Sequence, residues 1–84
     1  MLVPTIHLNG TSKKVLLEQV STAHNCLRDA MERLVLAAPN GRDYYPQGDG
    51  AIIQAMREHE GRMSRLAEVL DELEEMCLGV EDQQ

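Results

Sequence analysis

The sequence predicts an all-α protein: an antiparallel helical hairpin with a short N-terminal strand or arm, which assembles into a helical oligomer. Of its 84 residues 43% are hydrophobic but only 2% are aromatic, so the core must consist of aliphatic side chains and Met, as in packed helices. Two long stretches repeat apolar residues every three or four positions, and a turn-rich segment separates them. We expect one domain with an arm (1–11), a helix (12–38), a loop (39–49), a helix (50–78) and an acidic tail (79–84).

The N-terminal segment is β-prone over Thr5–Leu8 and ends in the turn pair Asn9-Gly10. A single strand has no hydrogen-bonding partner within a two-helix chain, so it would pair with another subunit or remain an extended arm. Thr11 or Ser12 can cap the helix that follows.

The first helix shows a heptad seam that ends before Pro39, which disfavours helical backbone at Ala38. One seam position in each heptad is Ala, which would let a partner helix approach closely. The predicted seam consists of Leu16, Val20, Ala23, Leu27, Ala30, Leu34 and Ala37, with Leu17, Met31 and Ala38 on one flank. His24 also flanks this seam, and we expect no chemical role for it.

The second helix is predicted to start at Asp49, which can cap it, and to end at Gly79. Its seam consists of Ile52, Met56, His59, Met63, Leu66, Leu70, Leu73 and Cys77. His59 is the polar exception, and a partner from the first helix or from another subunit would make it a register-setting residue. The alternative is that His59 contacts a ligand. Two such wide stripes cannot both be buried in one hairpin, so we expect a homo-oligomer.

Composition and charge exclude several classes of function. The net charge is −6, and residues 68–84 alone carry seven acidic side chains and no basic one, so we expect no binding to duplex nucleic acid. No apolar run is long enough to cross a bilayer, and a cytoplasmic location with two reduced thiols, Cys26 and Cys77, is expected. The scattered His and Cys residues predict no metal site, no catalytic constellation is recognisable, and no cofactor is expected.

The loop between the helices contains the only two aromatic residues of the chain, Tyr44 and Tyr45, close to Arg42. A Tyr ring can stack on a base and Arg can bind phosphate or carboxylate in a bidentate manner. The loop is also longer than a helix connection requires. We therefore predict a recognition site at Asn40, Arg42, Tyr44, Tyr45 and Gln47. The alternative is that the tyrosines cap the end of the hairpin and Arg42 is a solvated charge.

A second group of candidate residues precedes the first helix: His7, Asn9, Thr11 and Ser12. Free N–H groups and hydroxyls at a helix start suit an anion, and Lys13 and Lys14 reinforce this. The alternative is ordinary capping, in which the two lysines neutralise Glu72, Glu74 or Glu75 of the antiparallel helix. The two groups lie at opposite ends of a hairpin, so a shared pocket would need subunits arranged head to tail or antiparallel.

The strings Ile6-His7-Leu8-Asn9-Gly10-Thr11-Ser12 and Asn40-Gly41-Arg42-Asp43-Tyr44-Tyr45-Pro46-Gln47-Gly48 resemble motifs of a group of small bacteriophage proteins. By analogy with phage proteins that sequester immune nucleotide signals, this resemblance implies a non-enzymatic anti-defence protein in the host cytoplasm. Its ligand would be a cyclic nucleotide or a cyclic ADP-ribose derivative. The competing hypothesis is a helical interaction module that binds a host or phage protein.

Overall fold

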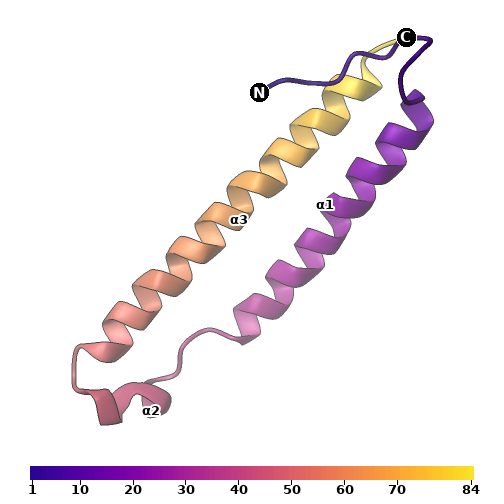
Figure 1. Cartoon of the computed structure of the whole chain (residues 1–84). Coiled ribbons are helices and arrows are strands. Elements are labelled where there is room, and N and C mark those ends of the chain that lie inside the picture. Colours follow the sequence, from indigo (N-terminus) through magenta and orange to yellow (C-terminus); the bar gives the residue numbers. More distant parts are fainter.

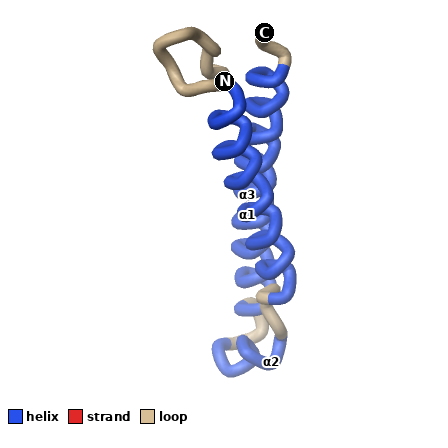
Figure 2. The backbone as a smooth tube through the Cα atoms, turned by 90° about the vertical axis from the view of Figure 1, so that its right-hand side faces the viewer, coloured by secondary structure: helices blue, strands red, loops and turns tan.

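The computed structural model describes all 84 residues as a long rod of 60 × 20 × 17 Å. Helix α1 (Lys13–Leu36) and helix α3 (Ala51–Glu81) run antiparallel, and helix α2 (Gly41–Tyr44) and the 3₁₀ turn η1 (Tyr45–Gln47) connect them at one end. Figures 1 and 2 show the two long helices side by side and both termini at the other end. The predicted all-α hairpin is confirmed. The N-terminal segment contains no strand and forms an extended arm.

The predicted seam of α3 is confirmed, because every one of its residues is buried or half-buried. His59 is the most buried of them, with 8% of its surface exposed. None of the hydrogen bonds within the chain involves its side chain, so no partner from α1 satisfies it. A register-setting role through another subunit stays a prediction.

The predicted seam of α1 is only partly right. The alanines at positions 23, 30 and 37 are exposed, and the helix turns a neighbouring set of residues toward α3. Leu16 of the predicted seam is half-buried, and the half-buried series with heptad spacing is Leu17, Val20, His24, Leu27, Met31 and Leu34. Larger side chains release more apolar surface from water than Ala does, so burying Leu17 and Met31 outweighs burying the alanines.

Three predicted helix boundaries need correction, and the first is the end of α1, which lies at Leu36 instead of residue 38. Ser12 caps α1 as expected, since its Oγ accepts from the backbone N–H of Val15 at 3.2 Å. Asp49 does not cap α3, because Gly50 occupies the N-cap position and no side chain bonds there. Gly79 does not end α3 either, since the helix continues to Glu81.

The N-terminal arm explains why α3 needs a glycine at position 79. A β-carbon placed on Gly79 would lie 2.8 Å from Cγ1 of Val3, so the missing side chain makes room for the arm. Val80 is only 1% exposed and is the most buried residue of the protein. The deepest packing therefore lies at this end of the rod, which we call the arm end.

Polar contacts hold the arm in place. Gln83 accepts from the backbone N–H of Ile6 at 2.7 Å, and its Nε2 donates to the carbonyl oxygens of Pro4 (2.7 Å) and Gly79 (3.2 Å). Lys13 Nζ donates to the carbonyl oxygens of Glu81 (2.7 Å) and Gln83. Because the last carbonyls of a helix carry partial negative charge, a lysine at this position stabilises the C-terminus of α3. The expectation that Lys13 neutralises Glu72, Glu74 or Glu75 is therefore wrong.

Candidate functional site

The connecting segment 39–49 forms an ordered structure at the other end of the rod, which we call the tip. Asn40 caps α2, since its Oδ1 accepts from the backbone N–H of Arg42 at 3.1 Å. Gly48 then turns the chain toward α3 with φ +107°, in the left-handed region that favours glycine. The predicted loop is thus a compact helical turn with defined side-chain positions.

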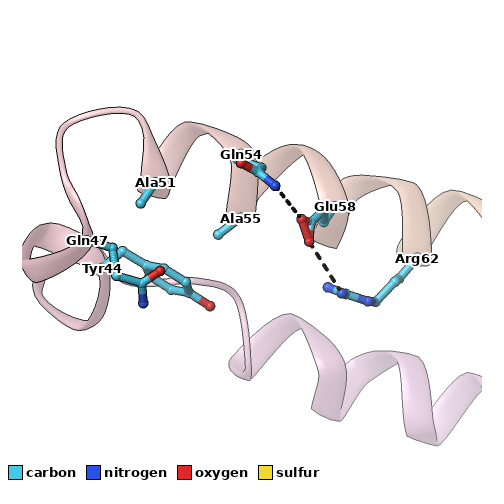
Figure 3. A pocket seen from close by; sticks show the side chains of 7 residues that line it. All are labelled: Tyr44, Gln47, Ala51, Gln54, Ala55, Glu58 and Arg62. Atoms are coloured by element: carbon cyan, nitrogen blue, oxygen red, sulfur yellow. Dashed lines mark hydrogen bonds and ion pairs between the residues drawn. The ribbon is translucent and has the colours of Figure 1, made fainter.

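The two tyrosines have different environments. Tyr44 is half-buried and its ring lies opposite Ala51 and Ala55 of α3 (Figure 3). Tyr45 is 75% exposed and borders no cavity. Tyr44 therefore covers part of the end of the hairpin, whereas the ring of Tyr45 is accessible to another molecule. Arg42 is exposed and forms no ion pair within the chain.

A cavity of about 240 Å³ opens beside Tyr44, between the tip and the first turns of α3. Figure 3 shows the Tyr44 ring and Gln47 on one side and the α3 side chains on the other. Its seven lining residues are Tyr44, Gln47, Ala51, Gln54, Ala55, Glu58 and Arg62. Two of the predicted site residues, Tyr44 and Gln47, thus meet in one cavity, whereas Asn40, Arg42 and Tyr45 do not line it.

On the α3 side, three polar side chains spaced one helical turn apart line the cavity. Gln54 Nε2 donates to Glu58 Oε2 at 3.4 Å, and Glu58 Oε1 lies 4.0 Å from Nη2 of Arg62. The side chains of Arg62 and Glu58 are 54% and 50% exposed, so solvent weakens this ion pair. The cavity thus offers an aromatic face, two amides, a carboxylate and a loosely held guanidinium. Such groups can bind a polar, partly aromatic molecule, but no nucleophile is paired with a base.

The second predicted group lies at the arm end and forms no pocket of its own. His7, Asn9, Thr11 and Ser12 are all exposed. The imidazole of His7 lies over Gly10, since a β-carbon there would be 2.8 Å from Nε2. Ser12 uses its hydroxyl as the α1 cap. Within one chain this group and the tip occupy opposite ends of a 60 Å rod.

Sequence reasoning missed Arg62, Glu58 and Gln54, although a signal for them exists. These residues repeat at intervals of four, so they share one face of a helix that starts just after the tip. The role of Gln83 had no local signal, because its partners Pro4 and Ile6 are almost eighty residues away in the chain.

Other classes of site find no support in the geometry. Nowhere do three His, Cys, Asp or Glu side chains lie where they could hold a metal ion together. Cys26 and Cys77 are unpaired, Cys26 exposed and Cys77 half-buried. None of the helices combines the length and apolar composition needed to cross a membrane.

Comparisons with known proteins add no assignment. No protein family, curated protein or solved structure matches this chain.

Proposed function

We propose that this protein binds a small nucleotide-like ligand at the tip and sequesters it unchanged, as a phage anti-defence protein in the host cytoplasm would sequester an immune signal. The observation that carries this proposal is the cavity in which the ring of Tyr44 and the guanidinium of Arg62 border the same space. A nucleotide presents an aromatic base and a phosphate, and these two side chains suit those two groups.

Four polar or aromatic side chains of the cavity have a role in this proposal, and the Glu58 carboxylate has none. The base stacks on Tyr44, and the amides of Gln47 and Gln54 hydrogen-bond its edge. The phosphate binds Arg62, which gives up its ion pair with Glu58 at little cost, because the pair is long and half-exposed. Arg42 and Tyr45 lie in the same tip segment and are free to contact a ligand portion that extends beyond the cavity.

The size of the cavity narrows the choice of ligand. A volume of about 240 Å³ is below the roughly 300–1,000 Å³ of pockets that enclose a drug-sized molecule. The cavity therefore suits one base with its phosphate, and a cyclic dinucleotide or cyclic ADP-ribose would need a further wall. The proposal predicts recognition of one end of such a ligand by this chain alone.

Calorimetric titration tests this proposal with cyclic dinucleotides, cyclic ADP-ribose and AMP as probes. Tyr44→Ala and Arg62→Ala should each weaken binding about tenfold or more, the effect of losing roughly 1.4 kcal/mol. Arg57→Ala is the matched control, because Arg57 is an exposed arginine on α3 that borders no cavity. Equal affinity in all three variants, or no heat with any probe, would contradict the proposal. Chromatography after incubation should recover the probe unaltered.

The second candidate function is a protein-interaction module, favoured by the exposure of Tyr45. Exposed aromatic side chains are common anchors of protein interfaces, and Tyr45 is 75% exposed beside the unpaired Arg42. This alternative predicts a purified partner protein whose binding is lost in Tyr45→Ser and retained in Tyr44→Ala. The same protein should then show no thermal shift with any of the nucleotides.

A further inference from the structure

The hairpin exposes more surface than a compact protein of its size. Its accessible surface is 6443 Å², about 1,400 Å² more than the roughly 5,000 Å² of a compact 9.4 kDa monomer. Only three of its 84 residues are buried. If a second copy covered this excess on each chain, the interface would total about 2,800 Å², within the range of obligate homodimers.

One face of α1 suits such a partner. Gln19, Ala23, Cys26, Ala30 and Ala37 are exposed and follow one another with helical spacing, and none carries a charge. We call these five residues the alanine face. Glu18, Asp29 and Glu32 lie on other sides of the helix, and Arg33, seven residues after Cys26, lies at the edge of this face. Small side chains let a second helix approach closely, so the alanine face can pack against another helix without rearrangement.

The alanine face continues onto α3. Leu34 follows Ala30 by one helical turn and borders an open cavity of about 270 Å³ with Arg62, Arg65 and Leu66 of α3. Val69 lies one turn beyond Arg65 and is 44% exposed. The resulting surface spans both helices, as one side of a four-helix bundle does.

The distribution of charge selects the orientation of the second copy. The half of the rod at the tip, residues 27–67, carries six basic and six acidic side chains and is neutral. The other half, residues 1–26 and 68–84, carries two basic and eight acidic side chains, a net charge of −6. Parallel copies would place the two acidic halves together, whereas antiparallel copies place each acidic half beside a neutral half that contains Arg57, Arg62 and Arg65.

We propose that two copies of this chain pair antiparallel through the alanine face and form a four-helix bundle. A two-fold axis perpendicular to the rod places α1 on α1 and α3 on α3. Cys26 lies close to the middle of α1, so the two Cys26 thiols face each other near that axis. The tip of one copy then lies beside the turn His7–Ser12 of the other. This inference stands independently of any ligand, but the partner's turn would supply the further wall that the tip cavity lacks.

Sedimentation equilibrium tests the dimer. The wild-type protein should sediment as a dimer at micromolar concentration, and Ala30→Glu should weaken association at least a hundredfold, because two carboxylates would be buried at the interface. Asn25→Glu is the matched control, since Asn25 is exposed on the same helix but outside the alanine face. A monomeric wild type, or an equal effect of both variants, would overturn the proposal.

Two measurements without the Ala30→Glu substitution test the orientation, even if that variant fails to fold. In Cys77→Ser, a short bis-maleimide should join two chains through Cys26. In the protein without cysteines, nitroxide labels at Asp43→Cys should lie apart by a distance approaching the 60 Å rod length. Labels close together would indicate parallel copies, and a Cys26 that forms no cross-link would exclude the proposed axis. Neither result depends on nucleotide binding, so failure of the dimer and failure of the proposed function are distinguishable.

Discussion

The two ends of the rod are built differently. At the arm end Val80 is 1% exposed, Gln83 makes three hydrogen bonds and Lys13 donates to the last carbonyls of α3. At the tip the hydrogen bonds are those of short turns, and Tyr45 and Arg42 remain exposed. The arm end is therefore closed by contacts between distant residues, while the tip leaves the side chains of Tyr45 and Arg42 accessible.

The largest expected effect on stability comes from a substitution that disturbs the packing at the arm end. Gly79→Ala would place a β-carbon 2.8 Å from Val3 and force the arm to move, at a cost of about 1–3 kcal/mol in the free energy of unfolding. Urea denaturation measures this cost, and hydrogen exchange should show faster exchange of the Ile6 amide, which Gln83 protects.

Gly61→Ala is the control for this substitution, because it lies in the same helix and its β-carbon would meet only the flexible end of Arg65 at 3.4 Å. It should stabilise the protein by about 0.4–1 kcal/mol, since it reduces the freedom of the unfolded chain. Equal effects at positions 61 and 79 would show that the arm does not pack on α3.

A substitution of intermediate effect probes the tip. Gly48→Ala should cost about 1–2 kcal/mol, because φ +107° is strained for a residue with a β-carbon. Gly41→Ala, in α2 with no atom within 4 Å of the added carbon, should leave stability unchanged or slightly raised. Thermal unfolding compares the two variants, and an unperturbed Gly48→Ala would mean that the tip turn adopts another conformation.

The smallest expected effect compares the two helix caps. Ser12→Ala should destabilise by about 1 kcal/mol, because Ser12 caps the 24-residue helix α1. Asn40→Ala removes the same kind of hydrogen bond from a four-residue helix. It should lower the free energy of unfolding by only a few tenths of a kcal/mol, because a short turn contributes little to global stability. Denaturation midpoints of both variants measure the difference, and a larger cost at Asn40 would reverse the order of stability inferred for the two ends.

The helices, the Ser12 cap and the α3 seam were predicted from the sequence, because they depend on local chemistry and on periodicity. The buried face of α1 was predicted wrongly, since two sets of heptad positions overlap there. Leu17, His24 and Met31 compete with Ala23, Ala30 and Ala37 for the same partner helix. Only the packing against α3 shows which set is buried.

Only part of the candidate site was predicted, because some of its residues lie in another segment of the chain. The tip segment stands out by its composition, so Tyr44 and Gln47 were identified without coordinates. Their neighbours Glu58 and Arg62 belong to α3, and their place beside Tyr44 depends on how the tip folds back onto that helix. The separation of Tyr44 from Tyr45 into one half-buried and one exposed ring likewise depends on the turn.

By itself the sequence determined that this protein is a pair of long helices with an aromatic, turn-rich connection and an acidic end. Those features follow from side-chain periodicity, capping residues and charge, which act over a few neighbouring positions. The tertiary structure alone decided that the arm packs on Gly79, that Lys13 meets the α3 carbonyls and that Arg62 joins Tyr44 around one cavity. These contacts join residues far apart in the chain, and steric fit between the two helices selects them.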